Sequence, residues 1–183
     1  MKKIILIFFL LNFNAEAQNT IKKNIINNLK KTKNLSFNFE QNINGKIETG
    51  NCIIEYPKKI YCKYNKKNKK ILVSDGKSVV IKANDGTYYR YRINKTPLNF
   101  ILDKNFIINE ITNLTERIID NKFVNFTIEK NDYEINIFFD IKNFNIIGWQ
   151  TIDVYQNLNI TFLSSIMKNQ KIKKNTFQIP LFN

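Results

Sequence analysis

The chain has 183 residues, 43% of them hydrophobic, which is enough for a single domain with a sizeable buried core. It carries 29 Lys and Arg residues against 15 Asp and Glu residues, a formal net charge of +14 at pH 7. Histidine is absent, so the commonest general base and metal ligand is missing, which argues against a catalytic or metal-binding protein.

Residues 1–17 have the pattern of a secretory signal peptide. Two lysines follow the initiator methionine, residues 4–11 form an unbroken apolar run, and a small-x-small cleavage pattern occupies residues 15–17. The run is shorter than the roughly 20 apolar residues of a membrane-spanning helix, which argues against an anchor. No cysteine stands at the cleavage point, so we expect residues 18–183 to form a soluble periplasmic domain that is not lipid-modified.

Export also bears on the positive charge. The signal peptide accounts for +1 of the net charge, which leaves +13 on the mature chain. The lysines are scattered among asparagines along the whole chain instead of forming one patch, and a nucleic-acid partner is hard to reconcile with export. We therefore expect no nucleic-acid partner, because attraction to an anionic membrane surface is a more natural use of this charge.

The mature chain is predicted to open with an amphipathic helix. Ile21, Ile25, Ile26 and Leu29 recur at helical spacing, and Thr20 is placed to cap the helix. From residue 35 onward the hydrophobic period changes to two, which is typical of strands. The alternation occurs in Leu35-Phe37-Phe39-Gln41, Val124-Phe126-Ile128, Ile135-Ile137-Phe139 and Leu158-Ile160-Phe162.

Turn signals separate the predicted strands, at Asn44-Gly45, Asp75-Gly76, Asp85-Gly86, Asn131-Asp132 and Lys142-Asn143. Short strands at even spacing predict a mainly β fold, an antiparallel meander closed or half closed into a barrel. One helix interrupts the strands, because Thr96 can cap it and Pro97 suits its first position. The sequence contains no linker or repeat that would divide the domain.

Cys52 and Cys62 lie on either side of Pro57, on strands predicted to be adjacent. In an exported protein they can form a cross-strand disulfide, which would contribute about 2–3 kcal/mol. The alternative is that both are small apolar side chains on the inner face of the sheet. The sequence leaves both interpretations open.

Motifs of catalysis are missing from the sequence. It has no Gly-rich phosphate loop and no Ser-x-x-Lys motif, and the carboxylates Glu40, Asp75, Asp140 and Asp153 stand singly. Such carboxylates are usually solvated residues of turns and polar strand faces. We therefore expect a protein that is not an enzyme and that uses neither a cofactor nor a metal ion.

A series of short motifs gives a more specific indication. In chain order they are Phe37-Asn38-Phe39-Glu40-Gln41, Gly50, Tyr56-Pro57, Leu72-Val73-Ser74-Asp75-Gly76-Lys77, Lys95-Thr96-Pro97-Leu98, Ile101-Leu102, Gly148-Trp149, Asp153, Thr161 and residues 177–180. In order and spacing they resemble the motifs of the outer-membrane lipoprotein carrier family, LolA, over nearly the whole mature chain. The run from Val73 to Lys77 is the most specific.

The resemblance implies an incomplete antiparallel β-barrel whose concave apolar face is covered by a lid of helices. It also implies a monomeric carrier that takes lipoproteins by their acyl chains from an ATP-driven release complex of the inner membrane and delivers them to an outer-membrane receptor. The lid would comprise residues 97–103 and the helix from Thr20. One alternative is a periplasmic sensor or interaction protein, which binds a protein partner with the same half-barrel, and another is a carrier for a different lipid.

In such a carrier the acyl chains would contact apolar side chains of the sheet and the lid. The candidates on strands are Phe37, Phe39, Ile54, Ile60 and Val73, and those on the lid are Leu98, Ile101 and Leu102. Ordinary core packing is the alternative for each of them, because strand alternation defines two faces without showing which one is empty.

One position departs from the family pattern. The residue before the proline is typically an arginine that hydrogen-bonds the lid and governs its opening, whereas here it is Tyr56. A phenol can make one such bond but lacks the several donors of a guanidinium group. The lid latch is therefore expected at Tyr56 or, for its basic character, at the neighbouring Lys58 or Lys59.

Overall fold

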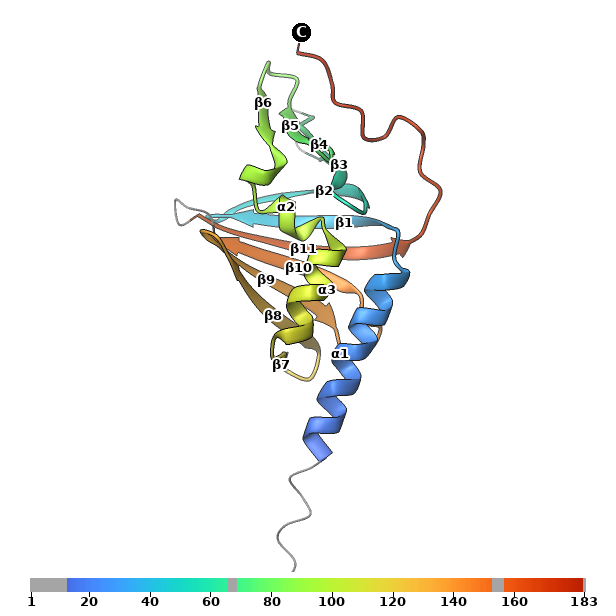
Figure 1. Cartoon of the computed structure of the whole chain (residues 1–183). Coiled ribbons are helices and arrows are strands. Elements are labelled where there is room, and N and C mark those ends of the chain that lie inside the picture. Colours follow the sequence, from blue (N-terminus) through green and yellow to red (C-terminus); the bar gives the residue numbers. More distant parts are fainter. Residues whose placement is uncertain (1–12, 66–68, 153–156, 183) are drawn as a thin grey trace, which may run out of the picture.

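The computed structural model describes residues 13–65, 69–152 and 157–182, with side chains from Thr20 onward (Figure 1). Most of the predicted signal peptide and Asp153 lie outside these residues. Within them, one antiparallel sheet of 11 strands dominates, and three α-helices lie against one of its faces. The expectation of a mainly β fold that is not fully closed is confirmed.

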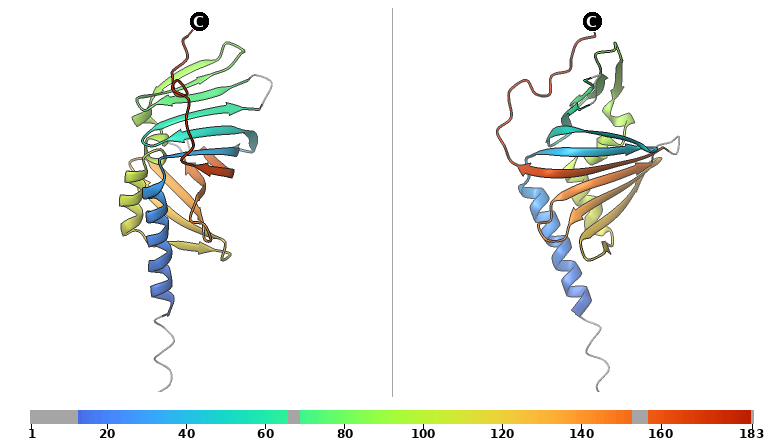
Figure 2. Two further views of the ribbon diagram at one scale, coloured as in Figure 1. Left: turned by 90° about the vertical axis from the view of Figure 1, so that its right-hand side faces the viewer. Right: turned by 180° about the vertical axis from the view of Figure 1, so that it is seen from behind.

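The strands form two consecutive meanders. The first meander comprises β1 (Asn34–Ile43), β2 (Lys46–Glu55), β3 (Lys59–Tyr64), β4 (Ile71–Asp75), β5 (Ser78–Lys82) and β6 (Tyr88–Arg92). The second comprises β7 (Arg117–Ile119), β8 (Phe123–Lys130), β9 (Tyr133–Asp140), β10 (Ile146–Ile152) and β11 (Leu158–Lys168). They meet where β1 pairs with β11, and β6 and β7 remain as edges. The sheet therefore curves around the helices without closing (Figure 1, Figure 2).

The predicted turns connect consecutive strands within each meander. Asn44 and Gly45 have positive φ angles of 50° and 87°, the left-handed conformation that a tight two-residue hairpin requires. Asp75 accepts hydrogen bonds from two backbone N–H groups of the following turn, each at 2.8 Å. Asp140 accepts two more, at 2.8 and 2.9 Å, from its own turn. These carboxylates therefore fix turns, as their type and place in the sequence indicate.

The core lies on the face of the sheet that the helices cover, which we call the inner face. Alternate residues of each strand point to it, and paired residues of neighbouring strands share a face. The members on β8 and β9 are at most 1% exposed, namely Val124, Phe126, Ile128, Ile135, Ile137 and Phe139. The members on β1 are Leu35, Phe37 and Phe39.

Strand β11 turns the alternating apolar residues Leu158, Ile160 and Phe162 away from this core. Leu158 and Phe162 are 38% and 57% exposed, whereas Thr161 and Leu163 are buried. Leu163 pairs with Phe39 of β1, and this register places Phe162 on the opposite, outer face. The alternation therefore identifies the strand, but the register with β1 decides which of its faces is buried.

Helix α1 (Phe13–Lys31) begins earlier than predicted. Thr20 lies inside the helix, so the prediction that it caps the helix is wrong; alanine, glutamate and glutamine in the preceding residues favour continued helix. Ile25 and Leu29 are 0% and 3% exposed and join the core, as their spacing predicts. In the described part of the chain, no helix is long and apolar enough to cross a membrane.

Between the meanders lie a 3-10 turn, η1 (Ile93–Lys95), and two helices, α2 (Leu98–Ile101) and α3 (Lys104–Asn113). The predicted cap at Thr96 is wrong, because its hydroxyl donates to the Ile93 carbonyl at 2.9 Å and Pro97 takes the N-cap position of α2. Helix α3 was not expected from the sequence. Asp103 caps it by accepting hydrogen bonds from two backbone N–H groups, at 3.1 and 3.2 Å.

Two lysines tie α1 to α3. The Lys22 ammonium donates to the Leu114 carbonyl at 2.6 Å and lies 3.4 Å from Oε2 of the buried Glu116. The Lys104 ammonium donates to the Thr32 carbonyl at 2.7 Å, just beyond the C-terminus of α1, where the helix dipole favours a cation. The two helices therefore form a linked pair, which lies over the second meander (Figure 1).

The segment after β11 turns back along the outer face of the first meander (Figure 2). The Tyr88 ring packs edge to face against Phe182 with ring centres 5.1 Å apart, and the Lys59 ammonium lies 5.8 Å from the centre of the Phe177 ring. We call residues 169–182 the C-terminal strap. It covers the side of the first meander that faces away from the helices.

Candidate functional site

A cavity of about 240 Å³ lies between the inner face of the first meander and the segment that contains α2. Its apolar lining includes Phe39, Ile60, Leu72, Val79, Leu98, Ile101 and Trp149. The volume is below the roughly 300–1,000 Å³ that is usual for small-molecule pockets. In this state the cavity is too small for a lipid with several acyl chains.

The residues predicted to contact acyl chains fall into three groups. The first group lines the cavity and consists of Phe39, Ile60, Leu98 and Ile101. The second belongs to the packed core and consists of Phe37, Ile54 and Leu102, each at most 3% exposed. The third is Val73 alone, which lies on the outer face.

The place of Val73 corrects the sequence prediction. It pairs with Tyr61 and Val80, whereas the cavity residue Leu72 pairs with Cys62. Because neighbouring residues of a strand point to opposite faces, Val73 points away from the cavity. It is nevertheless only 1% exposed. On the same face of β4, Asp75 lies beside the strap residues Phe177 and Gln178. Because both faces of β4 are buried here, the alternation of apolar and polar residues along the strand does not show which face Val73 lies on.

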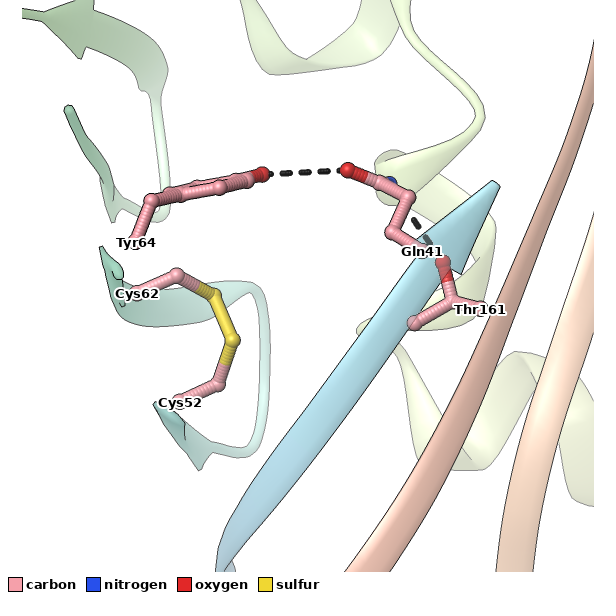
Figure 3. The surroundings of a disulfide bond; sticks show 5 residues. All are labelled: Gln41, Cys52, Cys62, Tyr64 and Thr161. Atoms are coloured by element: carbon pink, nitrogen blue, oxygen red, sulfur yellow. Dashed lines mark hydrogen bonds between the residues drawn. A yellow bond between two sulfur atoms is a disulfide. The ribbon is translucent and has the colours of Figure 1, made fainter. Parts of the chain in front are cut away.

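Cys52 and Cys62 form a disulfide in the wall of the cavity (Figure 3). They stand directly opposite each other on β2 and β3, with Cα atoms 4.1 Å apart. Nearby, the Phe39 ring lies so close to Gly50 that a Cβ at this position would be 2.7 Å from a ring carbon. The wall is therefore a covalently closed hairpin, and a glycine in it makes room for the aromatic ring.

One end of the cavity is polar (Figure 3). The Tyr64 hydroxyl donates to Oε1 of Gln41 at 3.2 Å, and Nε2 of Gln41 donates to Asn159 at 3.1 Å and to Thr161 at 3.3 Å. Burial raises the pKa of the Tyr64 phenol, and the negative charge of Glu48 adds to this effect. Tyr64 is therefore protonated at neutral pH and acts as a donor.

An ion pair lies beside this polar end. Glu48 is only 4% exposed, and its carboxylate is contacted by the Lys70 ammonium. The Lys46 ammonium lies 3.7 Å from the same carboxylate. The Lys70 ammonium also lies 3.9 Å from the centre of the Tyr64 ring, within the range of a cation–π contact. The buried negative charge is thus compensated by two cations.

The loop between β2 and β3 contacts the lid segment. The Lys58 backbone N–H donates to the Leu102 carbonyl at 2.7 Å, and the Lys58 ammonium lies 3.8 Å from Oδ2 of Asp103. Tyr56 packs its ring against the core, and its hydroxyl makes no hydrogen bond within the described residues. Burial raises the pKa of its phenol. Among the residues considered for the latch, Lys58 is the one that bonds to the lid segment.

The arrangement suits the binding of a molecule that has an apolar part and a polar part. Within residues 13–65, 69–152 and 157–182, no group of three or more His, Cys, Asp or Glu side chains is placed to hold a metal ion. The cavity combines an apolar wall, a short helix above it and a polar end. Such a site can enclose a hydrocarbon chain and hydrogen-bond the polar group attached to it.

Most of the chain matches a known protein family. Residues 30–180 fit the model of the family described as outer membrane lipoprotein carrier protein LolA. The chain belongs to the LolA family. The match takes in both meanders, α2, α3 and most of the strap, so every element that forms the cavity lies within the LolA region. LolA proteins bind lipoproteins, and the resemblance drawn from the motifs is confirmed.

Solved structures align with this LolA chain over nearly its whole length. A protein from Thermus thermophilus, described as an uncharacterized conserved protein, covers 91% of this chain and 94% of its own, with a TM-score of 0.50 and 6% identity. A LolA superfamily protein from Nitrosomonas europaea covers 88% and 97%, with a TM-score of 0.47 and 8% identity. Lipoprotein LppX from Mycobacterium tuberculosis covers 86% and 99%, with a TM-score of 0.47 and 10% identity. The likeness to the first concerns the fold alone, and no curated protein matches the sequence.

The sequence reasoning missed the polar end of the LolA cavity. Gln41 and Thr161 belong to the family-like motifs, but no role in the cavity was predicted for them. Nothing in the sequence around Asn159 indicated a binding site. Gln41 continues the inward series of Phe37 and Phe39 on β1. A polar residue at an inward position of an otherwise apolar series is the signal that could have located this end.

Proposed function

We propose that this LolA-family chain is a periplasmic carrier that shields the acyl chains of lipoproteins and moves them from the inner to the outer membrane, without catalysis. The observation that carries the proposal is the apolar cavity between a curved sheet and the four-residue helix α2. The family match supports lipoproteins as the cargo.

The size of the acyl chains determines what the lid must do. Exposing three acyl chains of about 16 carbons to water costs on the order of 35–40 kcal/mol, at roughly 0.8 kcal/mol per methylene. Non-covalent affinities do not exceed about 20 kcal/mol, so a carrier must cover the chains in part or use binding energy to open itself. The cavity of about 240 Å³ favours the second solution, in which α2 moves to admit the cargo.

Helix α2 is held by few polar contacts, although the Phe100 ring packs against Phe106 of α3 with ring centres 4.9 Å apart. Lys58 bonds to the residues at its end, and the Tyr133 hydroxyl donates to the Lys95 carbonyl at 3.1 Å just before it. Helices α1 and α3 are held to each other by the two lysine contacts described above. We therefore expect α2 to leave the inner face while α1 and α3 stay in place.

In this proposal the carrier works as a monomer between two membrane-bound partners. It receives lipoproteins from an ATP-driven release complex of the inner membrane and gives them to an outer-membrane receptor. Opening of α2 exposes the apolar wall on loading, and closure limits contact with water during transit. Lys58, together with the packing of Tyr56, would set how readily the lid opens.

The test is purification of the mature protein from its native envelope, with identification of what accompanies it. Co-purifying triacylated lipoproteins support the carrier. A lipid-free protein partner in a fixed ratio would refute it in favour of an interaction protein with the same fold.

Binding of a synthetic triacylated lipopeptide provides the matching test in vitro. Phe39→Asp and Ile101→Asp each place a charge against the apolar wall and should abolish binding. Phe162→Asp is the control, because this side chain is 57% exposed on the outer face. Full binding by both cavity variants, with circular dichroism showing that they are folded, would contradict the proposal.

A further inference from the structure

The polar end of the cavity contains a buried hydroxyl that is not hydrogen-bonded. Thr151 on β10 is 4% exposed and lines the cavity. Its Oγ1 makes no hydrogen bond within the part of the chain that the structure describes. Buried polar groups are nearly always paired, and an unpaired one costs about 1–3 kcal/mol. Valine has the same shape without this cost, so packing alone does not account for a threonine.

Other hydrogen-bonding groups stand next to Thr151. It is the cross-strand partner of Asn159, which accepts from the Gln41 amide. Gln41 links Asn159 to Tyr64, and all of these residues line the cavity. We call Gln41, Tyr64, Thr151, Asn159 and Thr161 the polar row. The cavity is thus amphipathic, with the polar row at one end and the apolar side chains of α2 and β3 at the other.

We propose that the polar row binds the polar head of an acylated cargo, namely the ester and amide carbonyl groups through which its acyl chains are attached. The proposal rests on the proposed function, because it places the head of the same cargo. These carbonyls lose their water when the chains enter an apolar cavity, and they then require protein donors. Thr151 offers a hydroxyl donor that the fold leaves unused.

The position of the polar row fits the path of such a cargo. The row lies where β1 ends and β11 begins, at the end of the sheet that carries the Asn44-Gly45 hairpin. The hairpin itself is exposed to solvent at Asn44, Gly45 and Lys46. A head group held there directs the acyl chains beneath α2 and leaves the polypeptide of the cargo free to extend into water.

The experiment compares two probes on single variants of the mature protein. The first probe is a synthetic triacylated lipopeptide, which has ester and amide carbonyls, and the second is the apolar dye 1-N-phenylnaphthylamine, which has none. Thr151→Val removes only the hydroxyl, and we expect it to weaken lipopeptide binding about two- to tenfold, the range of one hydrogen bond, without changing dye binding. Thr127→Val is the matched control, because Thr127 is exposed and bonds to Asn136 on the outer face.

A second variant tests the row as a unit. Gln41→Met keeps the length of the side chain but removes the groups that link Tyr64 to Asn159. It should weaken lipopeptide binding and leave dye binding unchanged. Two results would overturn this inference and leave the proposed function standing. One is that both variants lose affinity equally for the lipopeptide and the dye, and the other is that neither variant changes lipopeptide binding. An unaltered protein that binds the dye but no lipopeptide would overturn the proposed function, and the inference with it.

Discussion

The two meanders use their inner faces differently. On β8 and β9 of the second meander, the inward side chains are at most 1% exposed and pack with α1 and α3 in a core cluster that also reaches Ile101 and Leu102 at α2. The inner face of the first meander, together with β10 and β11 beside it, lines the cavity, and its cover is the short helix α2. The first meander is also reinforced by a disulfide on one face and by the C-terminal strap on the other. A densely packed region thus adjoins one that keeps apolar surface accessible.

This contrast has a physical reason. A protein that must open a binding site loses some packing whenever it opens, and regions of low local stability are where such motion occurs. If the site and the main core coincided, opening would threaten the whole fold. The strands with the most deeply buried side chains, β8 and β9, lie beneath α1 and α3, away from the cavity, while Ile101 and Leu102 at α2 extend the same core cluster to the cavity. The disulfide and the strap compensate for the thinner packing around the cavity.

The largest expected effect concerns the core beside α3. Phe126→Ala removes a fully buried ring and should lower the free energy of unfolding by about 3–5 kcal/mol. Leu98→Ala, on the half-buried surface of α2, should cost less than about 1 kcal/mol while weakening lipopeptide binding. Urea denaturation measures both. If Phe126→Ala and Leu98→Ala lowered the free energy of unfolding equally, the proposed difference between the two regions would be wrong.

The second effect concerns the disulfide between Cys52 and Cys62 in the first meander. The double variant Cys52→Ala and Cys62→Ala should lower the free energy of unfolding by about 2–3 kcal/mol, because a short loop is no longer closed in the unfolded chain. Guanidinium denaturation of the oxidised protein and the variant measures the difference. Mass analysis after alkylation checks the bond itself: two thiols that react without a reductant would contradict it.

The third effect concerns alkaline pH at the polar end of the cavity. Burial raises the pKa of Tyr64, so the folded chain keeps this proton after the unfolded chain has lost it near pH 10. The contribution of this group to the free energy of unfolding is therefore fully present below about pH 10. Above that pH the free energy of unfolding falls by about 1.4 kcal/mol per pH unit for each such group. Tyr64→Phe should reduce the slope of unfolding free energy against pH. An unchanged slope would contradict the assignment.

The smallest effect concerns the contact between the two regions at the lid. Asp103→Asn removes the charge that faces Lys58 but keeps a good N-cap for α3. A partly exposed ion pair contributes about 0.2–1 kcal/mol, so lipopeptide uptake should become about two- to fivefold faster with little change in stability. Stopped-flow fluorescence measures the rate. Glu55→Gln, which breaks a pair with Lys59 outside the lid, is the control, and equal rates in both variants would exclude a latch at Asp103.

Local signals in the sequence predicted several of the strands. Phe37 and Phe39 alternate with polar residues, and Asn44-Gly45 ends the run with a pair suited to a tight hairpin, so β1 and its turn follow from neighbouring residues alone. The apolar period of two likewise located β8 and β9. Helix α3 was missed, although Asp103 before Phe106 and Ile107 is a helix-start signal of the same local kind.

The features that could not be predicted depend on distant segments. Val73 lies on a face of β4 along which the strap runs, a segment that follows only after β11, and only the register with β1 shows that Phe162 faces outward. The polar row combines residues of β1, β3, β10 and β11, which become neighbours only when the two meanders join. For the same reason, the strand candidates Phe37 and Ile54 lie in the packed core instead of lining the cavity.

The pairing of β1 with β11 also determines the order in which the molecule can be completed. Strand β1 ends at Ile43, whereas its partner begins only at Leu158. One side of β1 therefore stays unpaired until the chain as far as β11 is available to fold with it. An unpaired strand edge can associate with other chains, so this interval is when the protein is most exposed to aggregation. The pairing of β1 with β11 in the middle of the sheet is therefore completed last.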